Sequence, residues 1–366
     1  MNYKKFTVCA LSAILFFVAL NFAIWKCCTE VLLTKKYDGG DLARMSYALG
    51  SKQKRKMVSD LPRRHITLKE YDGRKVDVLT IGDSFSMGGG EGRNSYYQDY
   101  IATINNCSVL NVYPYPTNDK VAGFAPISTL AVLMNSGYLD SIKPRYILIE
   151  SVVRYCLPRF ARRLDLSAAD SPERIRRYYA ETTYRLDYLP KVGFINDANF
   201  KYFYYNLMYR YSDNAFRGKI YRKKLSKSLF SARNDDELLL FYEELDTLPY
   251  INNQMVVAVN DTFNRLADIL EKKGIKLYFM PIVDKYDLYR EFIVDNPYQE
   301  NRFFDELRKL PKRYTLIDTK EILLPLVRAG EQDVFFADDS HWTWKASKKV
   351  FETVRFPCAG SNRSAP

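Results

Sequence analysis

A run of twenty residues without one charged side chain, from Phe6 to Trp25, stands near the start of this 366-residue chain. As a helix rising 1.5 Å per residue, such a run is about 30 Å long, the hydrocarbon thickness of a bilayer. It is longer than a typical signal-peptide core, and no small-residue cleavage motif precedes Lys26. We therefore expect an uncleaved transmembrane anchor over residues 6–26. A buried helix of a soluble core is the alternative, but the run has no polar stripe to support it.

The charges beside this run predict its orientation. Lys4 and Lys5 precede it, which favours a cytoplasmic tail at residues 1–5, although further lysines follow the run and weaken the asymmetry. The expected location is the cell (inner) membrane, crossed once, with the rest of the chain extracytoplasmic or periplasmic. The net charge of +12 would also suit a nucleic-acid binder. An extracytoplasmic location argues against nucleic acid as a partner.

Histidine and cysteine are scarce. The two histidines are His65 and His341, so a multi-histidine metal site is not expected, and we predict neither a metal nor another cofactor. Of six cysteines, three lie beyond the anchor region, at Cys107, Cys156 and Cys358. Three cysteines do not define a disulfide framework, and their pairing stays open.

The remaining chain divides by composition and pattern. Residues 27–74 are polar and basic without sustained periodicity, and we interpret them as a stalk in which His65 is solvated. A catalytic domain is expected over residues 75–357, followed by a tail at 358–366. Short β-branched runs predict five strands, at 76–82, 108–113, 145–150, 276–280 and 314–318.

Helical patterns lie between these strands, the clearest at residues 261–273 with Gly274 just past its end. Strands that alternate with helices indicate right-handed crossovers and a parallel sheet covered on both faces. The predicted fold class is α/β, a three-layer α/β/α arrangement around a five-stranded parallel sheet.

The alternation lapses between about residues 157 and 250, where we expect a largely helical insertion. Between residues 159 and 233 it holds 17 Lys and Arg against seven Asp and Glu, together with many tyrosines. One interpretation is a helical subdomain with its own aromatic core. A second is an acidic-saccharide site, because aromatic faces stack on sugars and arginine pairs with carboxylates. A third is docking onto anionic lipid or onto a membrane partner.

Two segments carry the predicted chemistry. Ser84 follows the first strand in Gly82-Asp83-Ser84, and ligands of an open α/β sheet bind at the carboxyl ends of its strands. His341 follows the fifth strand, behind Asp338 and Asp339. A serine nucleophile needs a base, and the base needs a carboxylate that fixes its tautomer. Ser84, His341 and Asp339 are therefore the candidate catalytic residues, with Asp338 as the alternative orienting acid.

These segments resemble the SGNH (GDSL-type) hydrolase superfamily, and 339–343 (Asp-Ser-His-Trp-Thr) resembles the D-x-H-W-T signature of its alginate O-acetyltransferase-like branch. The segments 144–154 and 272–286 resemble two strands of that branch, so the likeness covers most of residues 76–357. In this chain the serine precedes the Asp-x-His element, whereas in the alginate enzymes it follows.

The resemblance implies a flavodoxin-like SGNH fold and a role for each residue. Ser84 would accept the acyl group, His341 would be the general base, and the Ser84 amide would be one oxyanion donor. The superfamily's further donors are not plain here, and the candidates are Asn111 and Asn118. Glu150 and Arg154 are candidates for substrate binding or for a structural ion pair.

We therefore expect an O-acetyltransferase that modifies hydroxyls of an exported polysaccharide. By resemblance, its acetyl groups would be relayed by a multi-spanning membrane acyltransferase. A carbohydrate esterase or deacetylase with the same triad is one alternative, and a non-catalytic polysaccharide-binding scaffold is another.

Overall fold

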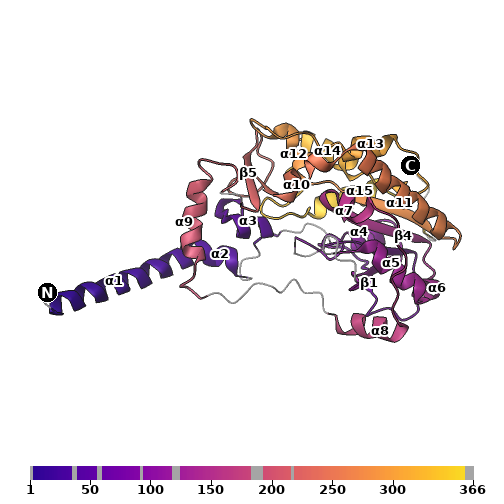
Figure 1. Cartoon of the computed structure of the whole chain (residues 1–366), viewed down its shortest axis with the longest axis horizontal. Coiled ribbons are helices and arrows are strands. Elements are labelled where there is room, and N and C mark those ends of the chain that lie inside the picture. Colours follow the sequence, from indigo (N-terminus) through magenta and orange to yellow (C-terminus); the bar gives the residue numbers. More distant parts are fainter. Residues whose placement is uncertain are drawn as a thin grey trace.

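The computed structural model describes residues 3–34, 39–55, 60–90, 94–117, 124–182, 193–215 and 218–358. Its N-terminal part is one continuous helix, made of α1 (Tyr3–Ile24), the π-helical turn η1 (Trp25–Thr29) and α2 (Glu30–Leu33). Figure 1 shows α1 projecting alone from the body of the molecule. Its apolar side chains are exposed; Phe16, for example, is 69% exposed. This helix is long and apolar enough to cross a membrane.

The body is an α/β fold built on a parallel sheet. Within the described residues, six strands form it in the order β1-β3-β2-β4-β7-β8, and every neighbouring pair is parallel. The strands are β1 (Ile66–Thr67), β2 (Val78–Ile81), β3 (Val109–Val112), β4 (Tyr146–Val152), β7 (Lys276–Ile282) and β8 (Thr315–Leu316). The last five match the five predicted strands. The sixth, β1, adds two residues from the segment expected to be a stalk.

The strand order determines where a site can form. Numbered along the chain, the five predicted strands lie in the doubly wound order 2-1-3-4-5. Connections from β2 and from β4 therefore leave the sheet toward opposite faces, and a crevice opens between the carboxyl ends of these two strands. Ser84 follows β2 at that point.

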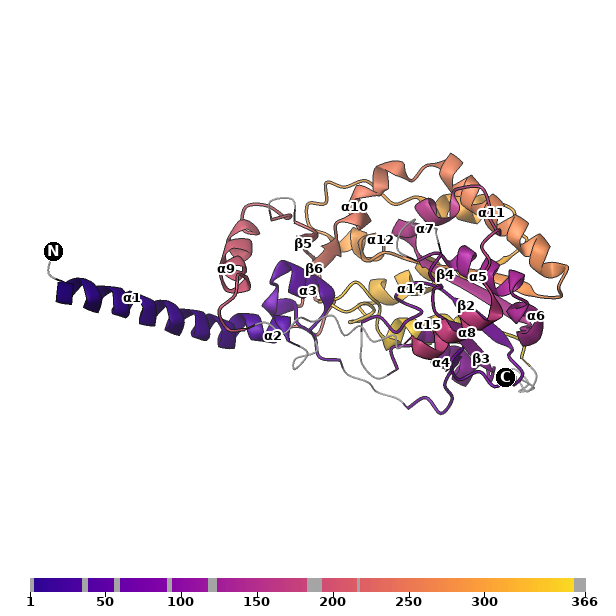
Figure 2. The ribbon, with the colours of Figure 1, turned by 60° about the horizontal axis from the view of Figure 1, so that its bottom comes forward.

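Helices cover both faces of the sheet (Figure 2). One row contains α4 (Tyr97–Ile104), α14 (Thr319–Arg328) and α15 (Trp344–Thr353). The other row contains α5 (Pro126–Asn135), α7 (Val153–Phe160), α11 (Asn253–Glu271) and α13 (Phe303–Lys309). Shorter helical segments are α6 (Tyr138–Ile142), α12 (Lys285–Tyr289) and η5 (Arg290–Phe292). The four central strands, β2, β3, β4 and β7, are buried along almost their whole length, as a doubly covered parallel sheet requires, whereas the edge strands β1 and β8 are partly buried.

The insertion is mixed rather than largely helical. It contains α8 (Pro172–Glu181), α9 (Ala198–Met208), an antiparallel pair of strands, β5 (Ile220–Lys224) and β6 (Glu237–Phe241), then α10 (Glu243–Asp246) and η4 (Leu248–Tyr250). Alternation in β6 was hidden because three consecutive leucines, Leu238 to Leu240, are all buried.

The segment after the anchor differs from the expected stalk. It forms α3 (Asp41–Ser46) and η3 (Leu49–Ser51), which pack on the β5–β6 pair. The contact is a second small core, made of Leu32, Leu42, Ala43, Ala48, Ile220 and Leu239. His65 is not solvated: its side chain is 9% exposed, and its Nδ1 lies 2.7 Å from a carboxylate oxygen of Asp99.

One disulfide closes the domain. Cys107, just before β3, is bonded to Cys358, which follows α15. Cys156 is a buried free thiol on α7. The bond therefore ties the last described turn of the chain to the sheet.

Candidate active site

Ser84 lies on a turn that buried charges hold in place. It is partly exposed, whereas Asp83 before it and Phe85 after it are buried. Asp83 accepts hydrogen bonds from the amides of Phe85 and Val152 and from the Arg159 guanidinium, the last at 2.6 Å. Burial works to raise the pKa of Asp83, but the Arg159 charge, together with hydrogen bonds from Arg159 and from the Val152 amide, keeps that pKa below its usual value. Asp83 thus braces the turn and leaves Ser84 facing outward.

Glu150, on β4, accepts hydrogen bonds from the turn that carries Ser84. Its Oε2 accepts hydrogen bonds from the Asp83 amide at 3.0 Å and from the Ser86 hydroxyl at 2.8 Å. Burial, together with the nearby Asp83 charge, raises the pKa of Glu150 well above its usual value. Glu150 is fully buried, so it is a support of the Ser84 turn and is not open to a ligand.

Arg154 belongs to a structural ion pair, which was one of its two predicted roles. Its partner is Asp284 rather than Glu150, with a guanidinium–carboxylate distance of 2.6 Å, and the Arg154 amide also donates to Asp284. Both side chains are buried. The pair joins the end of β4 to the end of β7.

His341 is carried on a narrow loop between residues 334 and 343. The Phe336 amide donates to the His341 carbonyl, and the Thr343 amide donates to the Val334 carbonyl. Lys285 lies buried inside this loop, where its ammonium donates to the carbonyls of Phe336, Ala337 and Asp339. The sequence did not predict Lys285 as a site residue, although this lysine lies in the segment 272–286, one of those that carry the resemblance.

The structure brings Ser84, His341 and Asp339 into one chain of hydrogen bonds. His341 Nε2 lies 2.7 Å from Ser84 Oγ, and His341 Nδ1 lies 2.6 Å from Asp339 Oδ1. An ionised carboxylate only accepts hydrogen bonds, so Nδ1 carries the proton and Nε2 is free to accept the one from Ser84. Ser84 and His341 are 257 positions apart in the sequence, so only the folded chain brings them into contact.

Electrostatics reinforces this arrangement. Burial works to lower the pKa of His341, but the charge of Asp339, its hydrogen bond and the charge of Asp41 raise that pKa above the usual value. Burial works to raise the pKa of Asp339, but His341 and Arg55 hold it well below its usual value. Asp339 is thus a carboxylate that stabilises the imidazolium form of His341.

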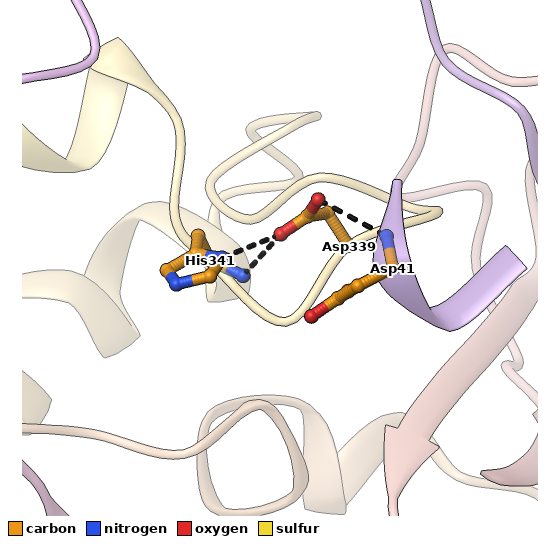
Figure 3. Close-up of side chains that lie close together, drawn as sticks. All are labelled: Asp41, Asp339 and His341. Carbon is orange, nitrogen blue, oxygen red and sulfur yellow. Dashed lines mark hydrogen bonds and ion pairs between the residues drawn. The ribbon is translucent and has the colours of Figure 1, made fainter. Parts of the chain in front are cut away.

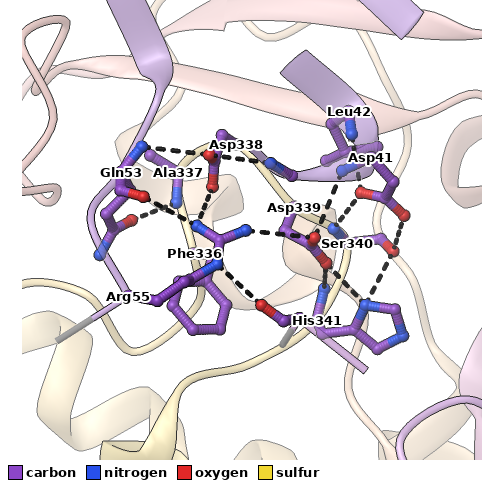
Figure 4. A network of polar contacts seen from close by, with 12 residues as sticks. Asp41, Leu42, Gln53, Arg55, Phe336, Ala337, Asp338, Asp339, Ser340 and His341 are labelled. Atoms are coloured by element: carbon purple, nitrogen blue, oxygen red, sulfur yellow. Dashed lines mark hydrogen bonds and ion pairs between the residues drawn. The ribbon is translucent and has the colours of Figure 1, made fainter. Parts of the chain in front are cut away.

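Asp338 faces away from His341, so of the two candidate acids only Asp339 orients the imidazole. The Asp338 carboxylate accepts from the amides of Gly40 and Gln53 and from Arg55, the last at 2.6 Å. Arg55 also reaches Asp339 at 3.3 Å, as Figure 4 shows. Arg55 therefore bridges both acids of the loop.

Asp41, in the segment that follows the N-terminal helix, contacts the loop that carries His341. Its carboxylate accepts from the Ser340 amide at 2.8 Å and from the Ser340 hydroxyl at 2.6 Å, and its own amide donates to Asp339. Neither Asp41 nor Arg55 was predicted. Each lies in a stretch without periodicity, about 280 to 300 residues from its partners, and no local signal marks it.

Two glycines allow the close approach of these segments. A Cβ on Gly89 would lie 2.2 Å from Nε2 of His341, and a Cβ on Gly40 would lie 2.0 Å from the carbonyl oxygen of Asp338. No side chain can be accommodated at either distance. Gly89 therefore makes room for the imidazole, and Gly40 lets the post-anchor segment reach the loop.

Asn111 is placed beneath the Ser84 turn. Its amide nitrogen donates to the Ser86 carbonyl at 2.7 Å, and its amide oxygen accepts from Thr80 at 2.9 Å. Because the side chain is fully buried, it serves the turn and does not reach an oxyanion. Asn118 lies outside the described residues.

Asp41, Asp339 and His341 also have the spacing of a metal site, since one ligand atom of each lies within 4.8 Å of the others (Figure 3). The hydrogen bonds argue for acid–base use instead. A cation would have to displace the Nδ1 proton from Asp339, and the Arg55 guanidinium already neutralises that carboxylate. The Asp41 oxygens are engaged by Ser340. We therefore interpret the cluster as the surroundings of a general base.

No protein-family model matches this chain, and no curated protein matches it.

Proposed function

We propose that this chain is a membrane-anchored, extracytoplasmic O-acyltransferase of the SGNH type, which moves acetyl groups onto hydroxyls of an exported polysaccharide. The observation that carries the proposal is the hydrogen-bonded series Ser84–His341–Asp339, with distances of 2.7 and 2.6 Å. The strand order 2-1-3-4-5, with the serine at the end of the first strand, agrees with the resemblance.

In this proposal Ser84 Oγ attacks the carbonyl carbon of an acyl donor while His341 Nε2 accepts the Oγ proton. The donor's alcohol or thiol leaves with that proton, and the acyl group stays as an ester on Oγ. An acceptor hydroxyl then gives its proton to Nε2 and attacks the ester carbon. Oγ leaves and recovers the proton. Asp339 holds the imidazole in place and stabilises its charged form throughout.

The anchor and the disulfide support the location. The N-terminal helix is long enough to span a membrane, and Lys4 and Lys5 before it favour a cytoplasmic N-terminus. Disulfides such as Cys107–Cys358 persist in oxidising compartments. Both observations favour a catalytic domain on the extracytoplasmic side, where an exported polymer and a membrane-embedded acyl relay would be accessible.

A cavity supports a saccharide acceptor. It has a volume of about 1090 Å³ and is lined by Tyr115, by four arginines, Arg159, Arg162, Arg163 and Arg174, and by two aspartates, Asp165 and Asp170. Ser84, His341 and Asp339 do not line this cavity; its link to the Ser84 turn is Arg159, which also binds Asp83, the residue before Ser84. Guanidinium groups bind carboxylates in two-point contacts, which suits an acidic sugar.

The test uses the full chain in detergent with an activated acetyl ester and a panel of oligosaccharides. We expect Ser84→Ala and His341→Ala each to lower acetyl transfer on the order of a thousandfold or more, because either change removes the nucleophile or its base. Ser141→Ala and His65→Ala, both outside the site, are the matched controls and should retain transfer.

The products separate the alternatives. Acetylated oligosaccharide that depends on Ser84 supports the transferase, whereas acetate alone, with every acceptor in the panel, favours an esterase. A wild-type protein as inert as Ser84→Ala toward ester and acceptors would contradict both and favour a scaffold that only binds polysaccharide.

A further inference from the structure

The helix α9 and the turn after it expose an aromatic stripe. Its members are Phe200 (72% exposed), Phe203 (55%), Tyr204 (41%), Leu207 (47%) and Tyr211 (80%). Positions three, four, seven and eleven residues apart lie on one face of a helix. A contiguous apolar face of this kind is unusual on a surface that only water contacts.

The opposite face of α9 is packed onto the body, so the direction of the stripe is determined. The Asn206 amide donates to the Tyr47 carbonyl at 3.1 Å, and the Tyr209 hydroxyl donates to the Ile220 carbonyl at 2.8 Å. The rings of Tyr205 and Tyr47 are in contact, with centroids 5.4 Å apart. The exposed stripe therefore faces away from the body.

Buried polar contacts join α9 to the end of the N-terminal helix. The Asn199 amide nitrogen donates to Asn21 at 3.0 Å, and its oxygen accepts from the Thr29 hydroxyl at 2.6 Å. Next to them the ring of Phe194 meets that of Phe22 edge-on. In Figures 1 and 2, α9 runs across this helix end and lies between the body and the side toward which α1 projects.

These contacts place α9 at a defined depth. The uncharged run ends at Trp25, and α9 meets the helix between Asn21 and Thr29, at the level where a spanning helix would leave the hydrocarbon. Two cations beside the junction are paired, Lys26 with Glu30 and Lys201 with Asp197, while Arg210 is exposed next to Tyr211 at the end of the stripe. The attraction of this region to a membrane would therefore be mainly apolar.

We propose that α9 lies in the bilayer interface, with Phe200, Phe203 and Leu207 inserted at the boundary between headgroups and acyl chains. Amphipathic helices with Phe and Leu on one face occupy this layer, and aromatic residues are enriched there. The inference rests on α1 crossing the membrane and is independent of the acyl chemistry. A second contact beside the anchor would prevent the domain from rotating freely above the membrane.

The test places a fluorophore on single accessible cysteines of the full chain, in a background where Cys9, Cys27 and Cys28 are serine and the free thiol Cys156 is buried. The protein is reconstituted in phosphatidylcholine nanodiscs whose lipid carries a nitroxide quencher near the headgroup end of its acyl chain. Labels at Phe203→Cys and Leu207→Cys should lose emission several-fold. A label at Ser141→Cys, on α6 at the far end of the body, should be unaffected.

A label at Phe16→Cys, with a quencher near the middle of the acyl chain, tests whether α1 crosses the membrane. This result is separate from the test of whether α9 lies in the interface. If Phe16→Cys is quenched while Phe203→Cys and Leu207→Cys behave like Ser141→Cys and are open to aqueous iodide, the interfacial helix is refuted and the anchor stands. That outcome would reassign the stripe to a protein partner. If Phe16→Cys is not quenched either, the anchor and the inference fall together.

Discussion

At the scale of single residues, His341 lies near two carboxylates, those of Asp339 and Asp41, whereas a serine triad contains one. His341 is bonded to Asp339, and Asp41 adds a second carboxylate that contacts the neighbouring Ser340. Burial works to raise the pKa of Asp41, and the Asp339 charge adds to that effect. The Asp339 and Asp41 charges raise the pKa of His341 against the effect of burial, so its imidazole holds its proton to higher pH than an ordinary histidine.

This charge predicts the pH dependence of the proposed reaction. Only neutral His341 can accept the Ser84 proton, so kcat/KM should rise with pH through a value above 6.5, the ordinary histidine pKa. Asp41→Asn removes one negative charge, lowers the pKa of His341 and moves this limb to lower pH. Profiles of the wild type, Asp41→Asn and Asp140→Asn, a surface control on α6, measure the effect. A limb that stays in place in Asp41→Asn would contradict it.

The stability that His341 contributes should fall with rising pH, whereas kcat/KM should rise. The pKa of His341 is raised in the folded protein, so the protonated histidine stabilises the fold at pH values below its unfolded pKa. That contribution is lost as the pH rises through the folded pKa. His341 therefore stabilises the fold most at low pH, where it is protonated and cannot accept the Ser84 proton.

At the scale of elements, the 334–343 loop is held by a buried charge in addition to the apolar core, which its Val334, Phe335 and Trp342 side chains join. Lys285 donates to three loop carbonyls and is fully enclosed, and burial lowers its pKa to about 8 despite the nearby Glu244 and Asp339. It therefore remains an ammonium ion at neutral pH. A neutral apolar side chain of similar length would leave those carbonyls without donors.

Lys285→Met should lower the free energy of unfolding by about 2–5 kcal/mol, because buried acceptors would lose their partners. It should also reduce acetyl transfer, since the loop positions His341. Urea unfolding followed by circular dichroism measures the first effect. Lys348→Met, on the partly exposed side of α15, is the control and should change little. Equal unfolding midpoints for the two variants would show that the loop does not depend on Lys285.

At the scale of the whole molecule, the Cys107–Cys358 bond spans 251 residues and joins the start of β3 to the end of the domain. A cross-link of this length restricts the unfolded chain strongly. It also fastens α15, which follows the 334–343 loop, to the sheet that carries Ser84.

The double variant Cys107→Ser, Cys358→Ser should lose about 2–4 kcal/mol of stability relative to the oxidised protein. Thermal unfolding with and without a reducing agent measures this loss. Reduction should destabilise the wild type and leave the double variant unchanged. If reduction lowered the wild-type melting temperature no more than that of the variant, the bond would contribute nothing to stability.

Local sequence patterns predicted a large part of this molecule. Five strands were predicted because short β-branched runs between helical patterns are typical of buried parallel strands. Ser84, His341 and Asp339 were predicted as site residues from their places at the carboxyl ends of strands and from the acidic pair before His341. The apolar N-terminal helix was predicted from twenty uncharged residues.

The remaining features depend on contacts between segments that are far apart in the sequence. Asp41 and Arg55 join the site across nearly 300 residues, β1 consists of two residues supported by β3, and Cys107 has its partner in Cys358 rather than in Cys156. The outward face of α9 depends on what covers its other side. These contacts join segments with no local periodicity, and their energies come from burial and charge pairing that exist only once the chain has folded.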